Sequence, residues 1–172
     1  FFDVIDAKWV KKKYISYEKS KPSERHISSA DELSAIFSFF KCLKSTNSAH
    51  LLYLEDDVSF HKNFGDLDIS KEVLDKFDVI FFCGVDIDII KPTSILYIPN
   101  SRKIGCFGTS GLLISSKFIK LVLSKYSVQY LIDKNMTIGM FLDYLRGIVT
   151  TLKFYATSMP LVLKNNNCNR ST

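Results

Sequence analysis

The sequence predicts an α/β layered fold, in which helices cover a sheet. Short apolar runs typical of buried strands alternate with longer stretches of helical periodicity. The runs at residues 51–54 and 77–83 are continuous, which fits strands buried on both faces. Residues 31–44 carry apolar side chains at i, i+3, i+4 and i+7, which predicts a helix with Ser28 or Ser29 as its N-cap.

The remaining elements continue this alternation along the chain. Further strands are expected at residues 2–5, 94–98, 111–114 and 152–155, and further helices at residues 115–124 and 137–147. In open α/β sheets, ligands bind beyond the carboxyl ends of the strands. This rule directs attention to the residues that follow Leu54 and Cys83.

Length and composition fit one globular domain, which we expect to span residues 1–172. Apolar residues make up 47% of the chain and charged residues 24%, a balance that argues against disorder. No apolar run approaches the roughly 18 residues that a membrane span needs, and the start does not read as a signal peptide. We therefore expect a cytoplasmic protein without a transmembrane segment.

The cysteines and the net charge exclude few classes of function. The four cysteines form no CxxC pair, so a structural zinc site is not predicted, and a reducing compartment is favoured. The formal net charge is +5, with many lysines near the N-terminus. Such a cluster can attract nucleotide phosphates, nucleic acid or an anionic membrane, and it is equally typical of a solvated helix face.

The strongest chemical signal is the acidic triplet Glu55, Asp56 and Asp57, directly after the apolar run 51–54. Adjacent carboxylates repel one another, and a bound divalent cation removes that penalty. Mg²⁺ and Mn²⁺ prefer hard oxygen ligands, commonly one or two carboxylates with phosphate oxygens and waters. Side chains alternate along an extended segment, so Glu55 and Asp57 should share a face while Asp56 points away. We expect Asp57 to be the direct metal ligand, supported by Glu55 or Asp56.

Two alternatives to this interpretation stay open. An acidic surface turn without a metal is possible because Asp is common where strands end. A second acidic pair, Asp86 and Asp88, follows the run 77–83 and has the same spacing as a metal pair. It is also typical of acids that alternate toward solvent.

Several segments, taken in order, match the motifs of one enzyme family. LLYLEDDV at residues 51–58 resembles the signature LILEDDV, DELSAIFSFF at 31–40 is similar to GEIGCALSHL, and FDVIFFCG at 77–84 to WDIIFLG. GTSGLLIS at 108–115 is similar to GTHAYIIS, and FYATSMPLVL at 154–163 to a terminal strand with its P-L-V segment. FDVIDA, near the start, is similar to the segment after the first strand. The family is that of the family 25 glycosyltransferases, of the lipooligosaccharide and collagen galactosyltransferase type.

This resemblance implies a GT-A fold, a nucleotide-binding α/β fold with a mixed, mostly parallel sheet flanked by helices. It implies a hexosyltransferase that moves a sugar, with inversion, from a nucleotide-sugar to a hydroxyl of a glycan or glycoprotein. A UDP-sugar is the expected donor, Mn²⁺ or Mg²⁺ the expected cofactor, and no nucleic-acid partner is expected. The first strand of the family has no counterpart before Phe1, so the domain is expected to lack it. The donor and cofactor are expected to bind at Glu55, Asp56, Asp57, Gly108, Thr109 and Ser110, with Asp57 and Glu55 as metal ligands.

The chain departs from the family pattern at positions that matter for catalysis. Phe39 and Ser110 stand where the family commonly has His. Gly139 stands at a family aspartate, so an expected carboxylate is missing there. Asp143 lies about one helical turn later on the same face and is the candidate replacement as catalytic base.

Two other functions follow from these observations. The departures at Gly139, Ser110 and Phe39 favour a glycosyltransferase-like protein that binds nucleotide-sugars without turnover. The carboxylates and the basic N-terminus are compatible with a metal-dependent nuclease, which needs clustered acids. That third function is the weakest, because the triplet lacks a closely following Lys in an E-x-K arrangement.

Overall fold

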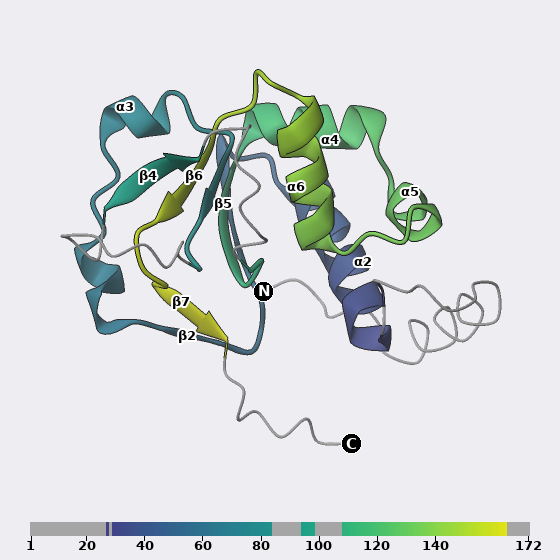
Figure 1. Ribbon diagram of the computed structural model, residues 1–172, viewed down its shortest axis with the longest axis horizontal. Helices are drawn as coiled ribbons and strands as arrows, with labels where there is room; N and C mark the ends of the chain where they lie inside the picture. Colours follow the sequence, from purple (N-terminus) through teal and green to yellow (C-terminus); the bar gives the residue numbers. More distant parts are fainter. Residues whose placement is uncertain (1–26, 28, 84–93, 99–107, 165–172) are drawn as a thin grey trace.

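The computed structural model describes residue 27 and residues 29–83, 94–98 and 108–164, and shows a mixed α/β fold (Figure 1). The predicted strand at residues 2–5 lies outside this part of the chain. The elements are, in order, α2 (Ala30–Ser45), β1 (His50–Leu54), β2 (Val58–Phe60), the 3₁₀ helix η1 (Lys62–Asp66), α3 (Lys71–Leu74), β3 (Val79–Phe81), β4 (Ile95–Ile98), β5 (Gly111–Ser115), α4 (Ser116–Lys125), α5 (Val128–Asp133), α6 (Ile138–Ile148), β6 (Phe154–Thr157) and β7 (Val162–Lys164).

Five of these strands form one mixed sheet in the order β1-β5-β3-β6-β4. Within the described sheet, β3 and β6 are parallel, whereas the pairs β1–β5, β3–β5 and β4–β6 are antiparallel. The predicted mixed sheet with flanking helices is confirmed, but the prediction that it is mostly parallel is wrong for these strands. Burial between two layers makes a strand apolar whichever way its neighbours run, so the apolar runs carried no information on direction.

Two hydrophobic clusters cover the two faces of this sheet. One contains buried residues of α2, α4, α5 and α6, which lie together on one side in Figure 1, and includes Val79 and Phe81 of β3. The other joins Ile80 and Phe82 to α3, η1 and the β2–β7 ribbon. Successive residues of β3 thus alternate between clusters, and the predicted burial on both faces is confirmed for this strand.

The same prediction is wrong for β1. Tyr53 is buried against Phe39 of α2, with ring centroids 5.3 Å apart, but Leu52 on the opposite face is 48% exposed. β1 stands at one end of the described strand order, and the second cluster reaches only its last residue, Leu54. Position in the sheet, which the residue types do not encode, decides this exposure.

The predicted helices are observed with small shifts at their ends. Ser29 caps α2: its hydroxyl accepts the Glu32 N–H, and the Glu32 carboxylate accepts the Ser29 N–H, which forms a capping box. Helices α4 and α6 begin one residue later than predicted. No helix in the described ranges is long and apolar enough to cross a membrane. The short elements β2, η1, α3, α5 and β7 were not predicted, because few residues in each carry a periodic signal.

Asp78 fastens the amino end of β3 to the start of β6. Its backbone N–H donates to the Lys153 carbonyl, and its Oδ2 accepts the Lys153 N–H, each over 2.8 Å. The side chain is fully buried, and its Oδ1 lies 3.4 Å from the Lys117 ammonium. These contacts fix the parallel register that places the carboxyl ends of β3 and β6 together.

Candidate functional site

The candidate site lies at the sheet edge where three strands end. Leu54 of β1 pairs with Gly111 of β5, and Phe81 of β3 pairs with both Leu112 of β5 and Ala156 of β6. The carboxyl ends of β1, β3 and β6 therefore share one edge with the amino end of β5. This edge carries the acidic triplet and the loop at residues 108–110, as the rule for α/β sheets leads one to expect.

Glu55 is the most connected side chain at this edge. Its Oε1 accepts a hydrogen bond from the Thr109 hydroxyl over 3.1 Å. Its Oε2 accepts from the Ser110 hydroxyl over 3.1 Å and from the Lys164 ammonium over 3.2 Å. The backbone joins the same segments, because the Glu55 N–H donates to the Ser110 carbonyl over 3.1 Å. Glu55, 15% exposed, is thus held by two segments that are distant in sequence.

Asp57 shares the positive charge that Glu55 binds. Its Oδ2 lies 3.6 Å from the Lys164 ammonium, and its side chain is 18% exposed. Burial by itself lowers the pKa of Lys164, but the charges of Glu55 and Asp57 and their hydrogen bonds outweigh it and raise the pKa above its ordinary value. Lys164 is therefore an ammonium ion at neutral pH, bridging two carboxylates.

The structure brings two acids of the triplet to one cationic group, although the chain turns at residues 56–57 and is not extended there. Glu55 and Asp57 approach one ammonium, whereas Asp56 is exposed and turns with the chain between β1 and β2. The division of labour predicted for a metal, with Asp57 as the direct ligand, is not tested by these contacts.

Two glycines at the start of β5 and just before it allow close packing against neighbouring segments. Gly108 has φ +75°, in the left-handed region that favours glycine, and a Cβ there would stand 3.3 Å from the Cβ of Cys83. A Cβ on Gly111 would stand 2.8 Å from the side chain of Val162, so glycine lets β7 pack closely on β5. This close approach brings Lys164, two residues after Val162, to the acidic triplet.

Sequence reasoning missed Lys164 altogether. It ends a three-residue strand in a segment where only the preceding apolar residues were interpreted. In the two-stranded ribbon, it pairs with Val58, which directly follows Asp57. A single Lys at a strand end is common, so only the pairing of β2 with β7 could reveal it.

Asp143, the predicted catalytic base, is not among the described residues that contact Glu55 or Asp57. It lies on α6, where its Oδ1 accepts a hydrogen bond from Arg146 over 3.2 Å. Burial raises the pKa of Asp143 above its ordinary value, although the Arg146 guanidinium opposes that change. Helix α6 leads into the amino end of β6, and its first turn, which contains Gly139, is the end of the helix farther from that connection. Asp143 stands about 6 Å farther along the helix axis.

The acidic pair fits a cation in its donor chemistry. Two carboxylates already converge on one positive charge, and Mg²⁺ or Mn²⁺ is commonly held by one or two carboxylates with phosphate oxygens and waters. Within the described residues no three acidic, His or Cys side chains gather as a metal group. A metal at Glu55 and Asp57 would therefore draw its other ligands from a bound diphosphate and water. The second candidate pair, Asp86 and Asp88, lies outside the described residues.

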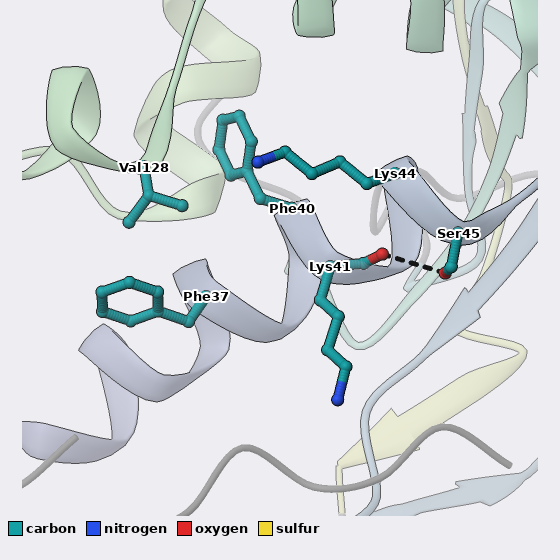
Figure 2. Close-up of a pocket in the computed structure, with 6 residues that line it drawn as sticks. All are labelled: Phe37, Phe40, Lys41, Lys44, Ser45 and Val128. Atoms are coloured by element: carbon teal, nitrogen blue, oxygen red, sulfur yellow. Dashed lines mark hydrogen bonds between the residues drawn. The ribbon is translucent and has the colours of Figure 1, made fainter. Parts of the chain in front are cut away.

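Two hollows of the described chain lie away from this edge. One, of about 560 Å³, is formed where α2 faces α5; Phe37 and Val128 face one another there, and Lys44 extends beside the ring of Phe40 (Figure 2). A second, of about 380 Å³, borders the loop between α2 and β1 and the start of α4, at the sheet edge opposite Glu55. Neither hollow is lined by a carboxylate, so neither offers a cation site.

Comparisons with protein-family models and with curated proteins return no match to this chain.

Proposed function

We propose that the protein is a metal-dependent glycosyltransferase with a GT-A fold, which transfers a sugar from a nucleotide-sugar to a hydroxyl of a glycan or glycoprotein. The observation that carries the proposal is the convergence of Glu55 and Asp57 on one cationic group at the edge where β1, β3 and β6 end. That edge is where α/β sheets bind nucleotides. The motif resemblance to family 25 glycosyltransferases supports the same assignment.

The local charge supports a role for a divalent cation. Glu55 and Asp57 face one ammonium, and the exposed Asp56 lies between them in the chain, so the site is net negative and repels a diphosphate. A divalent cation, when bound, supplies the positive charge that stabilises a leaving nucleoside diphosphate. The hydroxyls of Thr109 and Ser110 hold Glu55 in place, and Gly108 allows a donor to approach the backbone closely.

Asp143 is the carboxylate we propose as general base toward the acceptor hydroxyl. Its half-buried position raises its pKa, which favours proton uptake compared with an exposed aspartate. The ion pair with Arg146 holds it on α6, so the acceptor would have to reach the helix layer from the site edge.

The donor-binding part is tested by titrating the protein with UDP-sugars in the presence and absence of Mn²⁺. We expect binding that needs Mn²⁺ and that weakens by about tenfold or more in Asp57→Asn, because one of two carboxylates for the cation loses its charge. Asp75→Asn, an exposed carboxylate at the end of α3, is the matched control and should bind as the unaltered protein does. Failure of every nucleotide-sugar to bind with Mn²⁺ would refute the proposal.

The catalytic part is tested by measuring transfer or donor hydrolysis in Asp143→Asn. Loss of a general base lowers kcat by a factor of about 10² to 10⁴ while donor binding stays unchanged. The exposed-site variant Asp75→Asn again serves as the control. An unchanged kcat would remove Asp143 from the mechanism.

A nucleotide-sugar-binding protein without turnover is the second candidate. It is favoured by Gly139 in the first turn of α6, where the resemblance leads one to expect an aspartate, and by the pairing of Asp143 with Arg146. A turnover assay distinguishes the two functions. Both proteins would bind donors with Mn²⁺, but only the enzyme would release free or transferred sugar.

A further inference from the structure

The ammonium of Lys164 lies beside the Glu55 and Asp57 carboxylates, where a metal would have to bind. Its ammonium is 3.2 Å from Glu55 Oε2 and 3.6 Å from Asp57 Oδ2. It comes from β7, whose position is set by the pairing of Val58 with Lys164 and by the packing of Val162 on Gly111. The lysine therefore reaches the acids from a fixed strand.

The two oxygens that face Lys164 are Glu55 Oε2 and Asp57 Oδ2, and because both approach one ammonium they could bind one cation jointly. Glu55 Oε1 is engaged by the Thr109 hydroxyl, and Oε2 accepts from both Ser110 and Lys164. An ammonium and a divalent cation cannot share the space between these carboxylates, because like charges at 3 to 4 Å repel strongly. One cation must leave before the other can bind.

We propose that Lys164 is the resident counter-ion of the Glu55–Asp57 pair, and that a divalent cation binds there by displacing it. The inference rests on the proposed function for its choice of metal. Because Lys164 competes for the same carboxylates, the free protein should have a low affinity for the metal alone. Mn²⁺ or Mg²⁺ then binds well only when a diphosphate adds ligands and charge, so metal and donor bind cooperatively.

The test is Mn²⁺ binding without any nucleotide, measured by calorimetry or by the electron paramagnetic resonance signal of free Mn²⁺. Removing the competing charge in Lys164→Gln should tighten Mn²⁺ binding by about tenfold, after allowance for solvent screening at this partly exposed pair. Lys120→Gln, an exposed lysine on α4, removes the same charge far from the acids and should change binding by less than about twofold.

The unaltered protein offers a second readout that does not depend on a variant. In NMR spectra of the lysine side-chain ammonium groups, added Mg²⁺ should shift the Lys164 Nζ signal while that of Lys120 stays in place. Equal effects of the two variants, weaker Mn²⁺ binding in Lys164→Gln, or no detectable Mn²⁺ binding in any form would each overturn the inference. Since no nucleotide-sugar is present, a failure of donor binding or transfer would count against the proposed function alone.

Discussion

At the scale of single residues, Glu55 is both a candidate ligand and a structural junction. It accepts hydrogen bonds from Thr109, Ser110 and Lys164, and these donors come from the segment before β5 and from β7. A largely buried carboxylate that satisfies three donors stabilises the fold as well as the site. Its neighbour Asp56 is exposed and has no such role in geometry. Comparing variants of Glu55 and Asp56 therefore distinguishes the effect of lost hydrogen bonds from the effect of one lost negative charge.

We predict that Glu55→Ala lowers the free energy of unfolding by about 1 to 3 kcal/mol, because hydroxyls and an ammonium at a largely buried position lose their acceptor. The matched change Asp56→Ala should shift it by less than about 0.5 kcal/mol. Urea denaturation followed by circular dichroism measures both values. Similar losses in the two variants would show that the contacts of Glu55 contribute nothing specific.

At the scale of elements, the site depends on how the β2–β7 ribbon lies on the sheet. Leu161 and Val162 both donate backbone hydrogen bonds to the Phe82 carbonyl, and Phe82 donates to the Gly111 carbonyl. Val162 is buried directly over Gly111, where a Cβ would come within 2.8 Å. The absence of a side chain at one position of β5 thus sets the distance between ribbon and sheet, and with it the reach of Lys164.

Gly111→Ala should therefore destabilise the protein by about 1 to 3 kcal/mol, because the added methyl group overpacks against Val162. Gly147→Ala on α6 is the control: nothing lies within 4 Å of its Cβ position, and alanine favours the helix, so stability should stay equal or rise by up to about 1 kcal/mol. In the double variant Gly111→Ala/Val162→Ala the strain term should be relieved, giving a smaller loss than the sum of the single changes. Strict additivity in this cycle would mean that the two side chains do not interact.

At the scale of the whole molecule, one sheet joins two hydrophobic clusters. β3 contributes Val79 and Phe81 to the helix side and Ile80 to the ribbon side, where Phe82, directly after the strand, joins it. Neither cluster can lose its packing without exposing the central strand of the described sheet. This arrangement favours a single cooperative unfolding transition.

We expect Phe39→Ala, in the helix-side cluster, and Phe82→Ala, in the ribbon-side cluster, each to cost about 3 to 5 kcal/mol in the same transition. Both side chains are almost fully buried, so each change leaves a large cavity. Urea unfolding followed in parallel by far-ultraviolet circular dichroism and tyrosine fluorescence would give coincident midpoints. A second transition, seen by one probe or in one variant only, would contradict this prediction.

The sequence by itself determined the features that depend on neighbouring residues. A candidate N-cap at Ser28 or Ser29 and the period of apolar residues predicted α2, and the apolar run before Glu55 predicted a strand that ends in acids. Each of these signals lies within a few residues, where local geometry leaves little choice.

Only the tertiary structure decided which distant residues meet. Thr109 is 54 residues from Glu55 and Lys164 is 109 residues away, yet both bind the same carboxylate. The direction of β5 between β1 and β3 and the exposure of Leu52 were equally hidden. Strand order and ribbon packing are set by the sum of many non-local contacts, and no single residue type records them. For that reason the acidic segment could be predicted from the residues around it, whereas the lysine that pairs with Glu55 and Asp57 could not.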